Sequence, residues 1–363
     1  MSDRRLGENV RIVGSGLLGA SIGLGLTARG VDVVVDDISP SNRRLAIDYG
    51  AGRAPREDDA PGLIVVCVPP DVTASVVAAE LAAYPDALVT DVASVKQQPL
   101  EELERLGADL SRYLGTHPMA GREVGGPAAA RVDLFLGRPW VLAGHPAISY
   151  RRAGAIEDMI LDLGAVPVEM TVDEHDRSVA LISHVPQVVS SLLAARLVGG
   201  DGGALGLAGQ GVRDVTRVAS SDPQLWLQIL AANAAPVATI LAALRADLDG
   251  VIDALERLDS DAEEGARRAI VDALAAGNAG VARLPGKHGV DARYSQLVIL
   301  IDDSPGELAR LLTEVGELGV NLEDLRLEHS PGAPIGIVEV SVLPEALARL
   351  EAGLTERGWR IAG

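Results

Sequence analysis

His117 is the residue whose type and surroundings most directly suggest acid–base chemistry. It lies at the centre of residues 115–121, which read G-T-H-P-M-A-G. An imidazole can take or give a proton near neutral pH, although a single histidine in a loop is more often structural. Two patterns favour a chemical role here. A dinucleotide-binding pattern upstream would supply a hydride acceptor, and an arginine pair downstream would bind an anion.

The upstream pattern is a strand, a glycine-rich loop and a helix. Residues 14–19, G-S-G-L-L-G, fit G-x-G-x-x-G between a predicted strand at 10–13 and a helix at 20–29. The first glycine permits a tight turn, the second lets the backbone approach a pyrophosphate, and the third lets the helix pack closely on the strand. The residues predicted to contact the cofactor are Gly14, Ser15, Gly16, Leu17, Leu18 and Gly19.

Two aspartates follow the next predicted strand, at 31–35. They stand about 20 residues beyond the loop, where a carboxylate binds the ribose hydroxyls of a dinucleotide. Such a carboxylate would repel a 2′-phosphate, which favours NAD over NADP. We place Asp37 first and Asp36 second, because Asp37 directly precedes the predicted cap of the next helix. Arg43 and Arg44 lie close enough to leave NADP as an alternative.

Strands and helices go on alternating to residue 170. Buried strands are predicted at 63–68, 87–92, 112–115, 140–143 and 166–170. This alternation predicts an α/β fold, with a Rossmann-type domain over residues 1–172. Ligands lie at the carboxyl ends of the strands in such sheets. The residues at those ends are Val68, Pro69, Ser94, Lys96 and His117, and a turn or helix-cap role is the alternative for Ser94 and Lys96.

The pattern over residues 173–285 is helix after helix, which predicts a helical domain. Pro186 should kink the first of these helices, because proline removes a backbone donor. Arg213 and Arg217 are four residues apart, hence on one helical face, and their planar guanidinium groups suit carboxylates. Asp214 could instead pair with one of them. Because a long apolar helical segment in this place often supplies a dimer interface, we expect a homodimer.

Composition excludes several classes of partner and site. A formal net charge of -19 argues against nucleic acid and anionic membranes. No run approaches the ~20 apolar residues of a membrane span. The single cysteine, Cys67, cannot form a disulfide within the chain, which suits a reducing cytoplasm. His175 and His184 are nine residues apart rather than four, so we expect no metal site.

Five motifs, taken in order, resemble the prephenate dehydrogenases of tyrosine biosynthesis. They are G-S-G-L-L-G, D-V-A-S-V-K, G-T-H-P-M-A-G, E-H-D-R with S-H-V-P, and R-D-V-T-R-V-A-S-S-D-P-Q-L-W. The resemblance implies oxidation of the C4 hydroxyl of a cyclohexadienol by hydride transfer to NAD, with loss of CO2 as the ring becomes aromatic. It implies that His117 polarises the hydroxyl, Ser94 touches the hydroxyl and the nicotinamide, and Arg217 binds a substrate carboxylate. The other substrate-binding residues that it implies are Arg213 (a position more usually lysine), His184, Gln187, His175 and Trp226.

One position departs from that family. Gln187 follows S-H-V-P, where the family commonly has histidine, so prephenate and its amino analogue arogenate both stay open as substrates. A non-catalytic sensor of a nucleotide and an amino acid is an alternative from another class. The presence of His117, Ser94 and Arg217 counts against that sensor.

Residues 293–363 form a separate βαββαβ pattern after a linker. D-x-P-G precedes its first predicted helix and G-V-N-L follows it, which resembles an ACT domain of ferredoxin-like fold. The resemblance implies paired domains that bind an amino acid, here tyrosine, as an allosteric effector. The effector-binding residues that it implies are Asp303, Pro305, Gly306, Asn321 and Leu322. A dimerisation module without a ligand is the alternative, because allostery needs two sites and two states of differing affinity.

Overall fold

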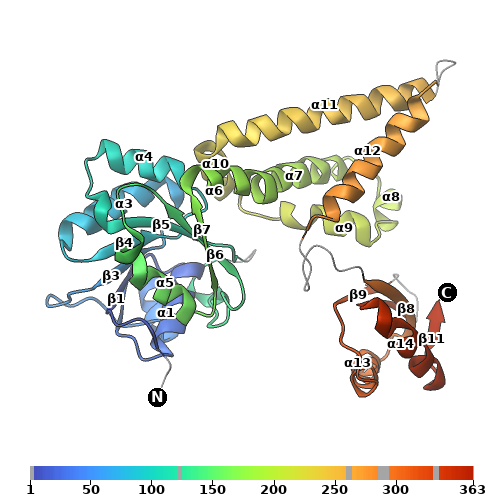
Figure 1. The fold of residues 1–363 in the computed structure, drawn as a ribbon, viewed down its shortest axis with the longest axis horizontal. Coiled ribbons are helices and arrows are strands. Elements are labelled where there is room, and N and C mark those ends of the chain that lie inside the picture. Colours follow the sequence, from blue (N-terminus) through green and yellow to red (C-terminus); the bar gives the residue numbers. More distant parts are fainter. Residues whose placement is uncertain (1–3, 122–124, 259–263, 285–293, 330–334, 363) are drawn as a thin grey trace. The chain divides into compact units, whose positions relative to one another are not determined.

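The structure, a computed structural model, describes residues 4–121, 125–258, 264–284, 294–329 and 335–362 (Figure 1). Contacts divide the chain into two compact units. One consists of Met1–Gly200 and Val215–Leu244, and the other of Asp201–Asp214 and Arg245–Gly363. The three domains expected from the sequence, 1–172, 173–285 and 293–363, stay a prediction.

A seven-stranded sheet in the order β2-β1-β3-β4-β5-β6-β7 forms the centre of the first unit. Its strands are β1 (Val10–Val13), β2 (Val33–Asp36), β3 (Leu63–Val66), β4 (Leu88–Asp91), β5 (Tyr113–Pro118), β6 (Pro139–Gly144) and β7 (Val166–Thr171). Neighbours are parallel except β5 and β6, which are antiparallel. The run L-I-V-V in β3 is buried on both faces, because helices cover both sides of such a sheet. The predicted Rossmann-type fold is confirmed.

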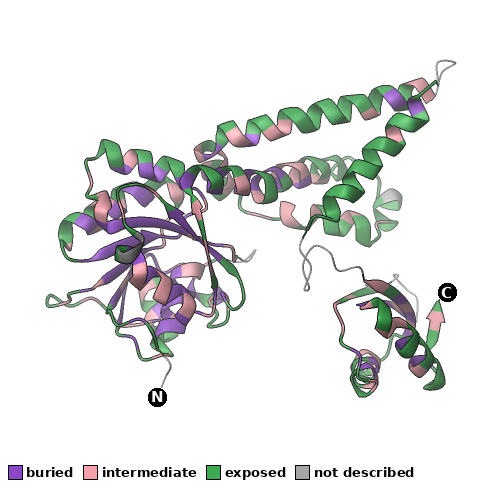
Figure 2. Cartoon of the chain, in the orientation of Figure 1, coloured by how far each residue is buried: buried purple, intermediate pink, exposed green. Residues whose placement is uncertain are grey.

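Helices and short 3-10 turns flank this sheet. They are α1 (Leu17–Thr27), α2 (Pro40–Asp48), α3 (Pro70–Ala83), α4 (Gln97–Arg105) and α5 (Gly154–Asp162), with turns η1 (Leu110–Arg112), η2 (Pro127–Ala129) and η3 (Tyr150–Ala153). One apolar core joins the sheet to α1 and α5 through residues such as Ile22 and Ile156. A second core joins it to α3 and α4 through residues such as Val77 and Leu103. Strands β1 to β5 are accordingly mostly buried between two helical layers, whereas the edge strand β7 is exposed or half-buried (Figure 2).

The carboxyl ends of β1, β3, β4 and β5 meet at one edge of the sheet, because these strands are parallel. Strand β1 lies between β2 and β3. The chain therefore runs to β2 on one side of β1 and returns to β3 on its other side. Ligand crevices of doubly wound sheets open at such a place. The loop after β1 does lie beside the residues that follow β3, since a Cβ added at Gly14 would stand 3.2 Å from Val68 Cγ1.

A continuous helical run follows β7. It consists of α6 (Val172–Val179), a π-helical turn η4 (Ala180–His184) and α7 (Val185–Leu197). Thr171 and Glu174 begin it with a reciprocal capping box. A kink was expected at Pro186; the helix continues through this residue, and a π turn comes directly before α7. Its wider spacing accommodates the proline ring, which in a regular helix would collide with the carbonyl four residues earlier.

By length and composition alone, Val172–Leu197 could cross a membrane, with a mean hydropathy of 1.5 in its most apolar window. Helices α10 and α11, introduced below, pass the same test as a pair bent by 96°. Both findings differ from our expectation that no apolar run approaches such a length. However, His175, Asp176 and Gln187 are buried within the first of these helices. Hydrogen-bonded polar groups in those positions fit a helix that lines a protein crevice.

Further helices complete the helical region. They are α8 (Gly202–Gly206), α9 (Gln210–Thr216), the 3-10 turn η5 (Arg217–Ala219), α10 (Pro223–Ala232), α11 (Ala234–Leu258) and α12 (Ala266–Val281). Apolar side chains are exposed on several of them: Leu227 of α10 by 62%, Leu255 of α11 by 53% and Leu274 of α12 by 67%. Figure 2 shows α11 and α12 as largely exposed. Exposed apolar faces of this kind are typical of surfaces that contact another protein, a membrane or a ligand.

The C-terminal part of the second unit has the expected βαββαβ order. Its elements are β8 (Ser295–Asp302), α13 (Glu307–Glu317), β9 (Asp324–His329), β10 (Ile335–Val342), α14 (Pro344–Glu356) and β11 (Arg360–Ala362). The strands form an antiparallel sheet in the order β11-β8-β10-β9. Its core is apolar, with Ile299, Leu311, Val338 and Leu354 fully buried.

Candidate active site

The glycine loop after β1 has the shape that a pyrophosphate requires. Gly14 has a φ of 96°, and a Cβ there would collide with the carbonyl oxygen of Cys67. A Cβ at Gly19 would collide with the carbonyl oxygen of Gly14. At Gly16, by contrast, nothing lies within 4 Å of the Cβ position. Gly16 also caps the N-terminus of α1, so open space stands in front of that helix end, where a dinucleotide phosphate fits.

The two aspartates after β2 have different partners. Asp36 pairs with Arg11 at 2.9 Å and with Arg43 at 3.1 Å, so it is held in ion pairs. Asp37 accepts hydrogen bonds from the backbone and the hydroxyl of Ser15 at 2.7 and 2.8 Å. Asp37 is therefore bonded directly to the glycine loop, and it stays our preferred ribose ligand. Arg43, one of the two arginines that left NADP open, pairs with Asp36, which weakens the NADP alternative.

His117 lies inside a strand rather than beyond its end. It pairs with Val141 of β6, and this antiparallel pairing extends β5 to Pro118, past the predicted end at residue 115. Its side chain is half-buried. The register places Gly115 opposite Asp91, the last residue of β4. The segment after that residue carries the half-buried Ser94, so strand pairing brings both predicted catalytic residues to the carboxyl edge of the sheet.

A buried chain of hydrogen bonds supports His117 from behind. His117 Nδ1 lies 2.9 Å from His175 Nε2, and His175 Nδ1 lies 2.7 Å from Asp176 Oδ1. The Asp176 carboxylate also accepts bonds from the backbone N–H groups of Lys96 and Gln97, both at 2.9 Å. His175 was expected to bind substrate. With both ring nitrogens bonded and no exposed surface, it instead orients His117.

A second branch leaves the same aspartate. Asn233 donates one hydrogen bond from Nδ2 to the backbone carbonyl of Asp176 at 2.7 Å, and Nδ2 lies 3.1 Å from His184 Nδ1. The His184 ring meets Trp226 edge to face, with centroids 6.0 Å apart. Among the described residues, no side chain or backbone group bonds Nε2 of His117 or of His184. Each histidine thus keeps one nitrogen for a ligand.

The protonation states follow from burial and partners. Burial first, and then His175, Lys96 and His184, hold the pKa of His117 well below its ordinary 6.5. Burial, opposed by the charge of Asp176, lowers the pKa of His184 to about 4. Burial by itself would raise the pKa of Asp176, but hydrogen bonds from His175 and from two backbone amides bring it below 3.8. At neutral pH His117 and His184 are therefore neutral and Asp176 is ionised.

Lys96, a candidate by topology, has a structural partner. Its Nζ lies 2.5 Å from Asp91 Oδ1, and both side chains are buried. Tyr113 donates to the other carboxylate oxygen at 2.7 Å. The lysine therefore balances a buried carboxylate, while its charge contributes to keeping His117 neutral.

Comparisons with known proteins agree with this site. The domain family described as "Prephenate dehydrogenase, nucleotide-binding domain" matches residues 22–169, and "Prephenate dehydrogenase, dimerization domain" matches residues 171–268. The chain is 37% identical to "Probable prephenate dehydrogenase NovF" of Streptomyces niveus, over 96% of this chain and 98% of that protein. The chain belongs to the prephenate dehydrogenase family. It is an NAD-dependent oxidoreductase, as the sequence predicts.

Two solved structures are similar over three quarters of this family member. The prephenate dehydrogenase of Aquifex aeolicus, in complex with hydroxyphenyl propionate and NAD+, has a TM-score of 0.65 and 25% identity, covering 76% of this chain and 98% of that one. The arogenate dehydrogenase of Synechocystis has a TM-score of 0.61 and 26% identity, covering 75% of this chain and 99% of that one.

The predicted arginine pair does not share one helix in this dehydrogenase-family chain. Helix α9 ends at Thr216, and Arg217 opens a 3-10 turn. The carbonyl of Val215 accepts a 2.7 Å hydrogen bond from Ser190 Oγ, which satisfies a group that a continuing helix would use. Arg213 belongs to the other compact unit. Both arginines are exposed, and Arg217 makes further polar contacts.

Gln187, the position that departs from the family pattern, is buried in α7. Its amide makes two long hydrogen bonds, at 3.4 Å to Ser191 and at 3.5 Å from Ser221. Neutral hydroxyl partners complement an amide and leave no charge beside it. A contact from Gln187 to a substrate would therefore be a neutral hydrogen bond.

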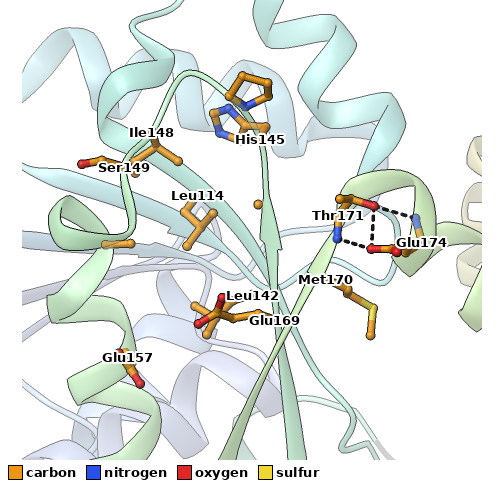
Figure 3. Close-up of a pocket in the computed structure, with 13 residues that line it drawn as sticks. Leu114, Leu142, His145, Ile148, Ser149, Glu157, Glu169, Met170, Thr171 and Glu174 are labelled. Carbon is orange, nitrogen blue, oxygen red and sulfur yellow. Dashed lines mark hydrogen bonds between the residues drawn. The ribbon is translucent and has the colours of Figure 1, made fainter.

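A cavity of about 510 Å³ lies elsewhere in the first unit (Figure 3). It opens between the ends of β6 and β7 and helix α5, with Leu114, Leu142 and Glu169 among its lining. Leu114 and His117 are three residues apart in β5, so their side chains point to opposite faces of the sheet. None of the site residues expected from the sequence lines this cavity.

The segments expected to bind an effector are separated within one chain. Asp302, just before Asp303, Pro305 and Gly306, pairs with Ile335 at the start of β10. Asp324, just after Asn321 and Leu322, pairs with Ser341 near the end of β10. Six residues of strand correspond to about 20 Å. A site that used both segments would require a second copy of the chain.

Two residues of the network were absent from our sequence-based expectations. Asp176 stands next to a histidine in E-H-D-R, which was a usable signal, since a carboxylate commonly orients a functional imidazole. Asn233 lies in an alanine-rich segment with no motif around it. Only the tertiary structure, which places the junction of α10 and α11 beside α6, identifies it.

Proposed function

We propose that this protein catalyses the NAD-dependent oxidative decarboxylation of prephenate to 4-hydroxyphenylpyruvate. The observation that supports it most is the pairing of a glycine loop shaped for a dinucleotide with a neutral His117 at the same sheet edge. Membership of the prephenate dehydrogenase family supports the same reaction.

The chemistry requires few protein groups. NAD, held by the glycine loop and Asp37, would supply the acceptor for the hydride that leaves the hydroxyl-bearing carbon. The hydroxyl proton must leave as well, and His117 Nε2 can take it. Loss of CO2 makes the ring aromatic, which drives the reaction forward. No C–H proton needs a base, and the residues described supply none for that purpose.

The remaining site residues receive roles by position. Ser94, after β4, would hydrogen-bond the hydroxyl and the nicotinamide, and Arg217 would bind a substrate carboxylate. Gly14 to Gly19, Asp37, Val68 and Pro69 would hold the cofactor. His184, Gln187 and Trp226 would line the substrate side. These assignments are proposals that mutagenesis of each residue tests.

Arogenate is the second candidate substrate. Gln187 favours it to some extent, because a neutral amide tolerates the ammonium group of arogenate better than a protonated histidine would. The similarity to an arogenate dehydrogenase, at 26% identity, is consistent with this alternative. A non-catalytic sensor is disfavoured by the intact hydrogen-bond network behind His117.

Three further proposals concern assembly and regulation. The "dimerization domain" match and the exposed apolar helices support a homodimer. The βαββαβ unit with D-x-P-G supports an ACT-like domain that binds tyrosine, for which the effector residues named above are candidates. The cytoplasm stays the predicted compartment, on the basis of the single cysteine.

The rate at which the purified full-length protein forms NADH tests the proposed reaction. We expect turnover with prephenate and NAD, a much lower rate with arogenate, and a change in rate on adding tyrosine. Turnover of arogenate alone would reassign the substrate. Absence of turnover with either substrate, with NAD or NADP, would contradict the enzymatic proposal.

A further inference from the structure

We propose that Asp176 sets opposite hydrogen-bond polarities at two histidines that face the substrate. Through its carboxylate and His175 it leaves His117 with an accepting nitrogen, and through its backbone carbonyl and Asn233 it leaves His184 with a donating nitrogen. His175, Asp176 and Asn233 are then positioning residues. The roles of the two histidines towards a substrate rest on the proposed function, whereas the positions of their ring hydrogens do not.

The first branch begins at two backbone amides, whose hydrogen-bond role is fixed because an N–H group can only donate. The amides of Lys96 and Gln97 donate to the two oxygens of Asp176 at 2.9 Å each. A carboxylate that already receives two donors is stable in its ionised form and accepts from its third partner as well. Nδ1 of His175, 2.7 Å from Oδ1, must therefore carry a hydrogen.

That assignment propagates to His117. A neutral His175 with its hydrogen on Nδ1 has a lone pair on Nε2, so it accepts there. His117 Nδ1, 2.9 Å away, must then donate. The one remaining nitrogen of a neutral His117 is Nε2, which consequently carries a lone pair. Nε2 has no partner among the described residues, so its lone pair is available to a substrate hydroxyl.

The second branch also begins at a group of fixed direction, the backbone carbonyl of Asp176, which can only accept. The Asn233 amide must present its NH2 group to that carbonyl, and the 2.7 Å contact from Nδ2 agrees. An amide flipped the other way would bring two oxygens together. The second hydrogen of the same NH2 group meets His184 Nδ1 at 3.1 Å, so that nitrogen accepts and Nε2 carries the hydrogen.

The two histidines are therefore complementary to a ligand with a hydroxyl donor at one point and an oxygen acceptor at another. When the hydroxyl O–H bond breaks, a new N–H bond forms at His117 Nε2. The positive charge that results is shared through His175 with the Asp176 carboxylate. His184 Nε2–H would hold an oxygen of the substrate without adding charge. The accepting nitrogen of His117 and the donating nitrogen of His184 both depend on Asp176 of α6.

Nitrogen-15 NMR of full-length protein labelled at histidine measures these proton positions directly. Long-range proton–nitrogen correlations at pH 7.5 distinguish Nδ1–H from Nε2–H rings, and His117→Asn and His184→Asn variants assign the signals. We expect His117 as the Nδ1–H form and His184 as the Nε2–H form. The same form at both rings, or the two forms exchanged, would overturn the proposal.

Asn233→Asp tests the second branch. A carboxylate at this position can only accept, so His184 should change to the Nδ1–H form while His117 keeps its own. KM for prephenate should rise while kcat changes less, because a binding contact is lost. If this variant does not fold, Asn233→Leu, which bonds neither group, should leave His184 as a mixture of both forms. A His184 signal unchanged in the folded variant would refute the role of Asn233.

His175→Gln and His175→Leu form a matched pair for the first branch. Glutamine can accept from His117 and donate to Asp176, so the Nδ1–H form of His117 should persist. Leucine offers no acceptor, so that form should lose its preference, and kcat should fall by about 100-fold, at the lower end of the range for general acid–base groups. Equal behaviour of the two variants would refute the tautomer argument. If the protein turned over no prephenate, the kinetic arm alone would fail and the NMR result would still decide.

Discussion

The two sheets of this protein differ in what they bury. Thr90, Asp91, Lys96 and Thr116 are fully buried at or beside the seven-stranded sheet, each with a hydrogen-bond partner. Within the described residues of the C-terminal four-stranded sheet, Ser341 is the one buried polar side chain. Buried polar groups cost free energy unless they are paired. The seven-stranded sheet therefore depends on paired polar groups in its interior, whereas the four-stranded sheet is stabilised mainly by apolar packing.

His117→Asn is the change with the largest expected effect, because it removes the proton acceptor. Turnover should fall by about 1,000-fold, within the range for general acid–base groups. The wild-type rate should fall on acidification at pH values below 6.5, because the pKa of His117 is lowered by burial, and the variant should lose that dependence. The sequence had suggested titration near neutrality. Steady-state kinetics across pH measure both effects.

The control for this prediction is stability. Asparagine fits the volume of the site, so the melting temperature should stay within a few degrees. A loss of turnover below tenfold in a folded variant would contradict the role of His117.

Lys96→Met tests the buried pair of the first sheet. It leaves the Asp91 carboxylate buried without its cation, and breaking such a pair typically costs about 3–5 kcal/mol. The double variant Lys96→Met with Asp91→Asn removes the charge and should recover part of the loss. Denaturant unfolding followed by tryptophan fluorescence measures the free energy.

An exposed pair in the C-terminal sheet gives the contrast. Arg360 and Asp302 lie 2.9 Å apart with most of each side chain in solvent. Arg360→Met should cost at most about 1 kcal/mol. If Arg360→Met and Lys96→Met lowered the free energy of unfolding by similar amounts, the difference we draw between the two sheets would be wrong.

Acid should destabilise the first unit through His184. Its pKa is about 4 when folded and about 6.5 when unfolded, so the unfolded chain binds more protons between these values. Stability then rises with pH across this window and is lost as pH falls from 6.5 towards 4, by about 3 kcal/mol in total. His117 contributes with the same sign, because burial lowers its pKa as well. Asp176 also has a lowered pKa, so its contribution has the same sign and is lost below about pH 4.

Melting temperatures recorded from pH 7 to pH 4 test this sign. His184→Gln, which cannot titrate, should flatten the curve relative to wild type. A wild-type stability that stayed constant or rose on acidification over this range would contradict the burial of a neutral His184.

Sequence patterns predicted most of the fold because strands and glycine loops carry local signals. The run L-I-V-V and the loop G-S-G-L-L-G determine their own structures, and β10 was predicted to the residue. The errors arose where tertiary pairing decides. Strand β5 extends over His117 because β6 pairs with it, and His175 turned out to be buried because α6 packs against the loop of Lys96. Asn233 could not be predicted at all, since its role depends on a contact across 57 residues.

Asn321→Ala should have the smallest effect on turnover, and it tests what the C-terminal sheet contributes. Asn321 is exposed and makes one long hydrogen bond, at 3.3 Å to Glu323, so its loss should leave basal kcat and the fold unchanged. If tyrosine binds at this loop, the variant should lose the response of turnover to tyrosine, and isothermal titration should show weaker binding. Thr313→Ala, an exposed change on α13, is the matched control and should keep both. A variant that responded to tyrosine as wild type does would remove Asn321 from the effector site. A wild-type enzyme with no response would leave this sheet with a role in assembly alone.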